Sequence, residues 1–323
     1  MTADFVFVSN DKYVKYLGIC TYSVMHNMCP VVEKVRLFVM DCGITEESKA
    51  KLRQQTAKFH NAVIVFIDIR KKLDEVVPKV ETKWNRAIYG RLFLTEIYKQ
   101  FDDVDRLIYL DCDVLIDRPV TELFTMPLDG KCMAGVLDID WFWRKKQMKM
   151  DPDAFYVNSG VLVVDTARWR ELDASAKIIE FINNYPDELS YPDQDAINYV
   201  LSSEIKVLDL RYNMMNMLTY SDAKKIVIYA VDYPFTEAQT IRALYNASIY
   251  HYSGHDMWSY DGITPAQRII FKKYRKLCDW RKEKMTFGGR DRFIHWLMVL
   301  AKRILICEWP RTYYFMAKKN WDE

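Results

Sequence analysis

Two acidic residues, Asp111 and Asp113, stand one residue apart directly after the short apolar run at residues 107–110. This run is rich in branched and aromatic side chains, which predicts a buried strand, and more apolar residues follow at 114–116. Carboxylates in apolar sequence are costly to bury unless a cation or hydrogen bonds neutralise them. Because ligands bind at the carboxyl ends of strands in α/β sheets, this pair is suited to hold a divalent metal that grips phosphate oxygens. The alternative is an ordinary acidic turn.

The sequence before these acids alternates between strand and helix patterns. Apolar runs predict strands at residues 5–8, 35–40, 63–68 and 107–110. Apolar residues three and four apart predict helices at 13–28 and 84–101. A further helix is expected to begin after Thr45, which two glutamates follow. Such alternation predicts right-handed crossovers and an α/β fold, a mostly parallel sheet with helices on both faces.

The alternation becomes less regular after residue 116. We expect strands at 132–137, 156–165 and 249–252, a helix at 193–201, and a mobile loop rich in Trp and Lys at 140–153. The glycine-rich patterns of dinucleotide-binding and P-loop proteins are absent from the sequence. This argues against a dinucleotide oxidoreductase and against a P-loop enzyme.

Composition favours a folded protein of a reducing compartment. Half of the 323 residues are hydrophobic, enough for a large core, and the formal net charge is only +2. The seven cysteines form no C-x-x-C pair, and an odd number in a long chain argues against a disulfide framework. The sequence opens without a secretion signal and has no apolar run of about 18–20 residues, so we expect a cytosolic protein.

Six short motifs in a fixed order make the chain resemble the family 8 glycosyltransferases. These are retaining enzymes of the GT-A fold that include bacterial lipopolysaccharide galactosyl- and glucosyltransferases and glycogenin. The resemblance covers residues 4–260. The motifs are the segment 9–18 with Asn10, Asp11 and Tyr13, the segment 87–92 with Arg91, the triplet Asp111-Cys112-Asp113, the segment 157–162 with Asn158, the triplet Asp193-Gln194-Asp195, and His251 with Gly254.

This resemblance implies a metal-dependent hexosyltransferase whose donor is a UDP-hexose, with glucose or galactose as the sugar. The ion would be Mn²⁺, with Mg²⁺ as the alternative, because two carboxylates and an imidazole suit Mn²⁺ better. Its implied ligands are Asp111, Asp113 and His251. The residues implied to contact the donor are Asn10, Asp11, Tyr13, Arg91, Asp111, Cys112, Asp138, Asn158, Gly254 and His255.

The same resemblance implies Gln194 and Asp193 as catalytic residues. Retention of configuration needs either a covalent intermediate, as in retaining glycosidases, or front-face attack by the acceptor. A glutamine is a poor nucleophile, but its carbonyl dipole can stabilise positive charge. We therefore expect front-face attack at an oxocarbenium-like carbon, with the leaving UDP phosphate as the base.

Three of these residues also have simpler explanations. Tyr13 could belong to the apolar face of the helix at 13–28. Arg91 could make a structural ion pair, because a guanidinium on an apolar helical face needs an anionic partner. Asp193 could cap the helix that begins after Pro192.

The sequence departs from the family pattern after Gly254. The family usually continues toward a lysine, a proline and a tryptophan, and the lysine contacts the diphosphate. Here the corresponding segment is one residue shorter, has neither lysine nor proline, and reaches Trp258 directly. His255, Lys145 or Lys146 could supply the missing positive charge. A nucleotide-sugar-binding protein without transferase activity is therefore the alternative function. A D-x-D phosphatase is disfavoured, because its acids would end the first strand.

Residues 265–323 are expected to form a helical tail after a catalytic domain at 1–264. The tail contains 15 Lys and Arg against six Asp and Glu, and apolar residues recur at helical spacing between Phe293 and Trp309. This pattern is typical of a helix that lies on an anionic membrane without crossing it. We expect a peripheral protein on the inner face of the membrane, a glycan or glycolipid acceptor of the lipopolysaccharide type, and no nucleic-acid partner. The alternative is a helix packed on the catalytic domain.

Overall fold

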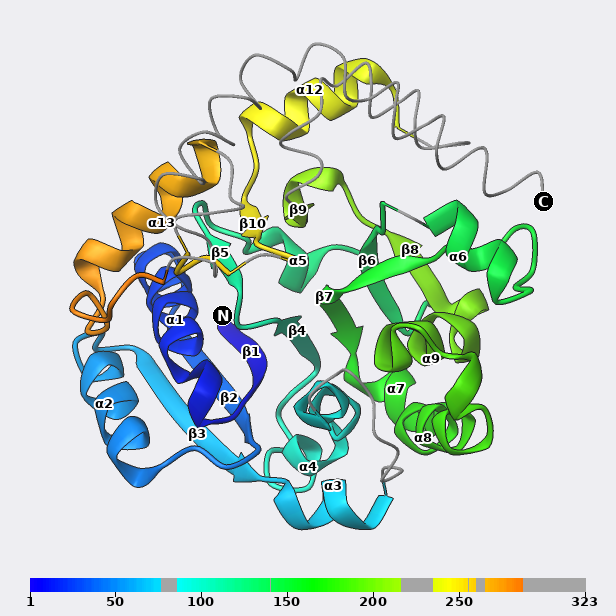
Figure 1. The fold of residues 1–323 in the computed structure, drawn as a ribbon, viewed down its shortest axis with the longest axis horizontal. Coiled ribbons are helices and arrows are strands. Elements are labelled where there is room, and N and C mark those ends of the chain that lie inside the picture. The colour runs from blue at the N-terminus through cyan, green and yellow to red at the C-terminus, as the bar shows by residue number, and fades with distance from the viewer. Residues whose placement is uncertain (77–85, 140, 216–234, 255, 260–264, 287–323) are drawn as a thin grey trace. The chain divides into compact units, whose positions relative to one another are not determined.

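The computed structural model describes residues 1–76, 86–139, 141–215, 235–254, 256–259 and 265–286 (Figure 1). The chain divides into two compact units. The first consists of Met1–Gly254 with Thr264–Glu283, and the second of His255–Ile263 with Lys284–Glu323. All helices and strands named below belong to the first unit.

A seven-stranded sheet forms the centre of this unit. Its strands, in spatial order, are β3 (Ala62–Asp68), β2 (Lys34–Asp41), β1 (Thr2–Ser9), β4 (Arg106–Leu110), β7 (Val157–Asp165), β6 (Met133–Leu137) and β8 (Ile205–Val207). Neighbouring strands are parallel except where β7 meets β4 and β6, so β7 runs against the rest of this sheet. The predicted α/β fold with a mostly parallel sheet is confirmed.

A smaller sheet continues from the acidic pair. Its strands, in spatial order, are β5 (Val114–Ile116), β10 (Ile249–His251) and β9 (Met214–Met215). Strand β10 is antiparallel to β5 and parallel to β9. Because β5 begins directly after Asp113 and β10 ends at His251, antiparallel pairing places these two residues at the same end of the ladder.

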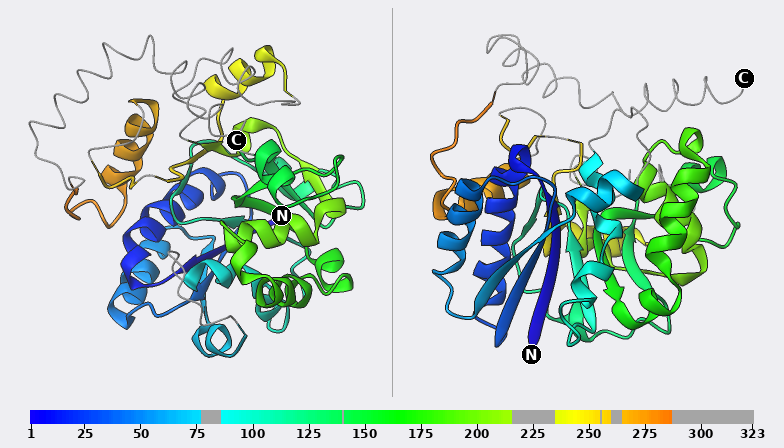
Figure 2. Two further views of the ribbon diagram at one scale, coloured as in Figure 1. Left: turned by 45° about the vertical axis from the view of Figure 1, so that its right-hand side comes forward. Right: turned by 90° about the horizontal axis from the view of Figure 1, so that it is seen from below.

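Helices cover both faces of the large sheet (Figures 1 and 2). The helices on one face are α1 (Val14–Met28) and α2 (Glu46–Thr56), and those on the other are the 3-10 helix η2 (Arg86–Leu92), α4 (Thr95–Tyr98), α8 (Ala174–Asn184) and α9 (Pro192–Val200). The other helices are α3 (Arg70–Val76), α5 (Glu122–Thr125), α6 (Trp141–Gln147), α7 (Thr166–Glu171), α12 (Glu237–Tyr245) and α13 (Pro265–Leu277). Short 3-10 turns are η1 (Asp11–Tyr13), η3 (Pro186–Glu188), η4 (Ser202–Glu204) and η5 (Leu210–Tyr212).

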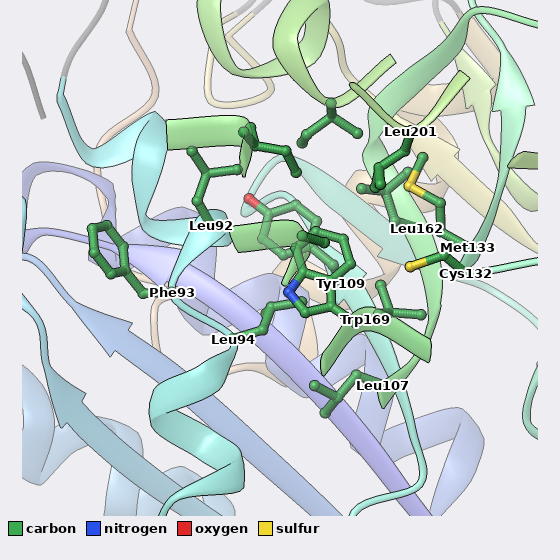
Figure 3. Packing of buried hydrophobic residues seen from close by; sticks show 14 of the residues in the cluster. Leu92, Phe93, Leu94, Leu107, Tyr109, Cys132, Met133, Leu162, Trp169 and Leu201 are labelled. Atoms are coloured by element: carbon green, nitrogen blue, oxygen red, sulfur yellow. The ribbon is translucent and has the colours of Figure 1, made fainter. Parts of the chain in front are cut away.

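The face toward η2, α8 and α9 is filled by aliphatic and aromatic side chains (Figure 3). Leu107 and Tyr109 point from alternate positions of β4 into this core, where they join Leu92 and Trp169. Burial of a large apolar side chain contributes about 1.5–3 kcal/mol to the free energy of unfolding. This core fixes β4 against the helices, and with it the position of Asp111 at the end of the strand.

The helix predicted at 84–101 is wrong as one continuous α-helix. Residues Arg86–Leu92 form a 3-10 helix, and within the described residues 86–101 only Thr95–Tyr98 is α-helical. Gly90 lies so close to β1 that an added Cβ would come within 2.5 Å of the side chain of Val8. Apolar spacing of three and four residues does not separate these forms, because residues three apart share one side in both.

The loop predicted at 140–153 contains helix α6. The guanidinium of Arg144 is buried and pairs with the carboxylate of Asp195 in α9. Its Nη1 also donates a hydrogen bond to Gln147. The helix thus depends on a partner far away in the sequence, which the local pattern of Trp and Lys does not reveal.

A local signal at the start of α2 is confirmed. Thr45 is the N-cap residue of α2, and its hydroxyl accepts a hydrogen bond from the backbone amide of Ser48 at 3.3 Å. Glu46 and Glu47 occupy the first turn, where the helix dipole favours negative charge.

The first part of the predicted tail packs on α1. Tyr274 of α13 accepts a hydrogen bond from Asn27 of α1 at 2.8 Å, and the ring of Trp280 covers Gly18. The apolar residues between Phe293 and Trp309 lie outside the described residues, so the predicted tail and its boundary at residue 264 stay predictions. Among the helices of the described part, none is long and apolar enough to cross a membrane.

Candidate active site

The ladder between β5 and β10 assembles a cluster of two carboxylates and an imidazole. His251 pairs with Val114, and the backbone amide of Tyr252 donates a hydrogen bond to the carbonyl oxygen of Asp113 at 2.9 Å. One ligand atom from each of Asp111, Asp113 and His251 lies within 4.8 Å of the others. The structure therefore brings together the three predicted metal ligands, two of which are half-buried and one, His251, buried.

The carboxylate of Asp111 is oriented by its neighbours. The hydroxyl of Tyr109 donates to Oδ1 at 2.6 Å, and Nη2 of Arg91 contacts the same oxygen at 2.9 Å. The other oxygen, Oδ2, lies toward Gly160 of β7. An added Cβ at Gly160 would come 2.9 Å from this oxygen and 2.3 Å from Cε1 of His251. A glycine at this position thus leaves room between Asp111 and His251.

The pKa values within the cluster shift in opposite directions. Burial lowers the pKa of His251, but the nearby carboxylates together outweigh burial and raise this pKa overall, and the strongest of them is Asp113, 3.4 Å from Nε2. Burial raises the pKa of Asp113, yet His251 lowers it below its usual value. Two acids around one imidazole retain negative charge that a divalent cation would neutralise. The donor set and the space beside Gly160 therefore fit a metal ion, and they suit Mn²⁺ better than Mg²⁺.

Arg91 connects this cluster to helix α9. Its side chain is buried, and Nε contacts the carboxylate of Asp193 at 2.9 Å while Nη1 donates to the backbone and side-chain oxygens of Ser159 at 2.7 Å. Burial raises the pKa of Asp193 even though Arg91 opposes this shift. Asp193 lies inside α9, whose N-cap residue is Tyr191, so its predicted alternative role as the N-cap is wrong.

The amide of Gln194 in α9 is hydrogen-bonded at both ends. Its oxygen accepts hydrogen bonds from the backbone amide of Ser159 at 2.9 Å and from Nδ2 of Asn158 at 3.3 Å. Its nitrogen donates to the carboxylate of Asp138 at 3.2 Å and to the hydroxyl of Tyr156 at 3.1 Å. The structure thus brings the predicted sugar-side residues Asp138, Asn158 and Gln194 into one network.

Helix α9 is tied to β7 by a pair of backbone contacts. Asn198 accepts a hydrogen bond from the amide of Val157 at 2.7 Å and donates to the carbonyl of the same residue at 2.8 Å. These two hydrogen bonds fix the position of α9 along β7, so that Asp193 and Gln194 lie near Asn158.

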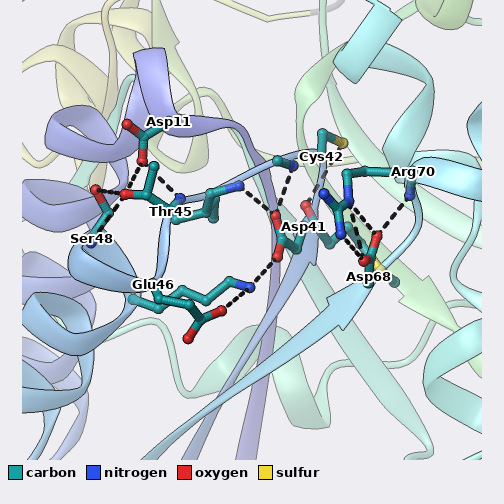
Figure 4. A network of polar contacts seen from close by, with 12 residues as sticks. Asp11, Asp41, Cys42, Thr45, Glu46, Ser48, Asp68 and Arg70 are labelled. Atoms are coloured by element: carbon teal, nitrogen blue, oxygen red, sulfur yellow. Dashed lines mark hydrogen bonds and ion pairs between the residues drawn. The ribbon is translucent and has the colours of Figure 1, made fainter.

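The predicted uridine-binding residues follow β1 directly, and Figure 4 shows Asp11 beside Thr45. Asn10 caps the turn η1, and Asp11 accepts hydrogen bonds from the backbone amide of Thr45 at 3.0 Å and from its hydroxyl at 2.8 Å. The hydrogen bond from the Thr45 amide lowers the pKa of Asp11. Tyr13 is 48% exposed, so the alternative that it belongs to the core is wrong.

The remaining donor-side predictions are Cys112, Gly254, His255 and the two lysines of α6. Cys112 is buried, and its thiol donates a hydrogen bond to the carbonyl of Val8 at 3.1 Å, so its side chain is directed to β1. Gly254 has a φ of +75°, a conformation that side chains rarely adopt. His255 lies outside the described residues. On α6, Lys146 is exposed and Lys145 is half-buried, with its amine in contact with the carbonyl of Pro152.

Several residues of the site were not predicted from the sequence. Asn213 lies 2.9 Å from both His251 and Asn158, and Tyr109 binds Asp111. Asp195, the last residue of the Asp193-Gln194-Asp195 motif, binds Tyr156 and Arg144. The tyrosine hydroxyls of the predicted strands, Tyr109 and Tyr156, were the available signal, whereas the sequence around Asn213 offered none.

A mostly parallel α/β sheet with such a cluster and amide network at one end of its strands is the arrangement expected of a glycosyltransferase. The chain belongs to glycosyl transferase family 8, whose family model matches residues 4–260. General stress protein A of Bacillus subtilis (strain 168) is 31% identical over 207 residues, which are 64% of this chain and 71% of that protein. The lipopolysaccharide 1,2-glucosyltransferase of Escherichia coli (strain K12) is 29% identical over 154 residues, 45% of each chain, so the match spans less than half of that enzyme.

Solved structures share the fold. The galactosyltransferase LgtC, in complex with donor and acceptor sugar analogs, superposes with a TM-score of 0.68 at 23% identity and covers 85% of this chain and 96% of its own. The apo structure of the bifunctional glycosyltransferase WbbM gives the same TM-score at 18% identity, covering 88% of this chain and 52% of its own. The likeness to LgtC confirms the predicted GT-A fold.

Proposed function

We propose that this family 8 enzyme is a metal-dependent, retaining hexosyltransferase that moves glucose or galactose from a UDP-sugar to a glycan or glycolipid acceptor. The proposal rests on one observation. The possible metal ligands Asp111, Asp113 and His251 lie near Gly160, and the hydrogen-bonded network of Asn158 and Gln194 lies beside the same residue. A lipopolysaccharide-type acceptor is supported by the relationship to the Escherichia coli glucosyltransferase. The exposed ring of Tyr13, with Asn10 and Asp11, would bind the uridine.

Asp111, Asp113 and His251 would hold Mn²⁺, which, when bound, neutralises the charge that develops on the diphosphate leaving group. Arg91 orients Asp111 through Nη2 and holds Asp193 through Nε. In this assignment Asp193 is neutralised by its arginine and is poorly suited to attack the sugar as a nucleophile. It positions Arg91 and Gln194 instead.

The sugar side would hold the hexose by hydrogen bonds. Asp138 and Asn158 present a carboxylate and an amide, and Gln194 lies between them. An amide oxygen places partial negative charge near the anomeric carbon without forming a stable covalent bond. In front-face attack the acceptor oxygen bonds to this carbon on the face that UDP leaves, and the hydroxyl proton passes to a departing phosphate oxygen.

A donor screen tests the proposal directly. UDP release from UDP-glucose and UDP-galactose is measured with Mn²⁺ and with a chelator, with and without truncated lipopolysaccharide acceptors. We expect Mn²⁺-dependent release that rises with the acceptor, and retention of the anomeric configuration in the product by NMR. Binding of the UDP-sugar without any release would favour the nucleotide-sugar-binding alternative, which the missing lysine and proline after Gly254 suggest.

We also propose that the chain acts at the inner face of an anionic membrane through residues 265–323. The support is the excess of Lys and Arg in this segment and the apolar spacing between Phe293 and Trp309. Sedimentation with anionic vesicles at low and high salt is compared for the full chain and for a chain truncated after Thr286. We expect the full chain to pellet at low salt and the truncated chain to stay in solution. Equal pelleting of both contradicts the membrane role of the tail.

A further inference from the structure

The site has a metal half, formed by Asp111, Asp113 and His251, and a sugar half, formed by Asp138, Asn158 and Gln194. Asn213 lies between them. It precedes β9, and its side chain is completely buried. Its Oδ1 lies 2.9 Å from Nδ1 of His251, and its Nδ2 lies 2.9 Å from Oδ1 of Asn158. The predicted metal ligand and a predicted sugar-side residue are therefore bridged by one amide.

The orientation of the Asn213 amide follows from that of Asn158, which a backbone contact determines. The amide of Gly160 donates a hydrogen bond to Asn158 at 3.0 Å, and a backbone N–H only donates, so the Asn158 atom that it meets is the oxygen. The other end of Asn158 faces the carboxylate of Asp138 at 2.9 Å, which only accepts when ionised and so requires the NH₂ group there. Both neighbours assign the same orientation to Asn158.

The assignment then passes from Asn158 to His251. The group of Asn213 that faces the oxygen of Asn158 must be its NH₂, so its oxygen faces Nδ1 of His251. An amide oxygen only accepts, and Nδ1 must therefore carry a proton. In the neutral ring this leaves the lone pair on Nε2, the nitrogen that lies 3.4 Å from Asp113.

We propose that Asn213 is a positioning residue that holds neutral His251 in its Nδ1–H tautomer and so directs the Nε2 lone pair toward the metal position. The inference rests on the proposed metal site. Metal-binding histidines generally donate their second N–H to an outer partner, and such partners affect metal affinity. The outer partner in this chain is a side-chain amide whose other end is bound to Asn158. One side chain therefore contacts both a predicted metal ligand and a predicted sugar-side residue.

The tautomer can be measured without a variant of Asn213. Protein labelled with ¹⁵N at its five histidines is studied free of metal, under alkaline conditions in which the ring is neutral, by long-range ¹H–¹⁵N correlation. The signals of His251 are assigned by their loss in His251→Gln. We expect a protonated Nδ1 and an unprotonated Nε2. A protonated Nε2 overturns the proposal.

Two substitutions of Asn213 separate its two contacts. Asn213→Leu removes both, and we expect calorimetric Mn²⁺ affinity to fall about 10- to 100-fold. Asn213→Asp still accepts from Nδ1 but cannot donate to Asn158, so Mn²⁺ affinity should be retained while the affinity for UDP-hexose falls relative to that for UDP. Wild-type Mn²⁺ affinity in Asn213→Leu, or equal loss in both variants, contradicts the proposal.

Asn61→Leu is the matched control. Asn61 donates hydrogen bonds to the carbonyls of Cys29 and Val32 outside the site, so its loss should lower the melting temperature but leave Mn²⁺ affinity unchanged. A similar loss of Mn²⁺ affinity in this control would attribute the effect to destabilisation and overturn the proposal. If Asn213→Leu does not fold, the tautomer of the wild-type protein decides. Wild-type protein that binds no Mn²⁺ refutes the proposed function, whereas the tautomer measurement still tests the role of Asn213.

Discussion

The metal half and the sugar half of the site differ in how their polar groups are satisfied. In the metal half, Asp111 and Asp113 converge on His251, and the guanidinium of Arg91 contacts only the first of these acids directly. In the sugar half, both ends of the Gln194 amide are hydrogen-bonded, and one of its partners is a backbone amide. The metal half therefore keeps an excess of negative charge even with Arg91 beside Asp111, whereas the sugar half is already ordered by its own contacts.

This difference implies different roles in catalysis. A cluster with excess negative charge gains its full stability only when a cation binds, so changes there should act on binding of the metal and of the diphosphate. A preorganised amide network keeps its geometry before the donor arrives, so changes there should act on the rate of transfer. Four substitutions test this division.

Asp113→Asn should have the largest effect. The substitution keeps the shape of the side chain but removes its charge beside His251. We expect Mn²⁺ affinity to fall by more than the roughly 10–100-fold typical of losing an outer partner, and the Mn²⁺ dependence of UDP binding to disappear. Calorimetric titration of UDP with Mn²⁺ and with chelator measures this. Unchanged Mn²⁺ dependence in the variant would refute the metal assignment.

Gln194→Ala should lower kcat by about 10²–10³-fold while UDP affinity stays near that of the wild type, because the carbonyl dipole acts mainly in the transition state. Steady-state kinetics and UDP titration measure the two quantities. Gln55→Ala is the matched control, since Gln55 is a buried glutamine bound to the carbonyl of Gly18, and it should lower stability without changing kcat. A loss of UDP affinity equal to the loss in rate would show that Gln194 only holds the donor.

Gly160→Ala should weaken Mn²⁺ binding about 10- to 100-fold, because the new methyl group would displace His251. Gly18→Ala introduces the same methyl group 2.3 Å from the ring of Trp280, away from the cluster. This control should lower the melting temperature and leave Mn²⁺ affinity intact. Comparable Mn²⁺ affinity in the two variants would contradict the role of Gly160 as space for the ion and its ligands.

Tyr156→Phe should have the smallest effect on binding. It removes the hydroxyl that donates to Asp195 at 2.5 Å and accepts from Gln194, and we expect a loss of about 1.5–3 kcal/mol in the free energy of unfolding, with Mn²⁺ affinity unchanged. Tyr98→Phe is the control, because the buried hydroxyl of Tyr98 has no hydrogen-bond partner among the residues that the structure describes. Denaturant unfolding compares them. Equal stability of both variants would mean that the Tyr156 contacts contribute nothing.

The sequence could predict the elements that depend on local pattern. The apolar run of β4 and its acidic end follow from burial and from the cost of burying charge, and the cap at Thr45 follows from the chemistry of one turn. The six motifs then predicted which side chains would meet, and the structure brings Asp111, Asp113 and His251 within reach of one another. It also places Asp138, Asn158 and Gln194 together.

The contacts that orient these side chains were decided by the tertiary structure. Asn213 reaches His251 because β9 and β10 are neighbours in the small sheet, and Gly160 reaches Asp111 because β7 runs antiparallel beside β4. Helix α6 forms where a loop was expected, with Arg144 paired to Asp195 across the sequence. Strand order and packing determine these contacts between residues distant in the sequence, and a local sequence pattern predicts neither. The residue types were therefore set by the sequence, whereas the proton on His251 and the direction of the Gln194 amide depend on which strands became neighbours.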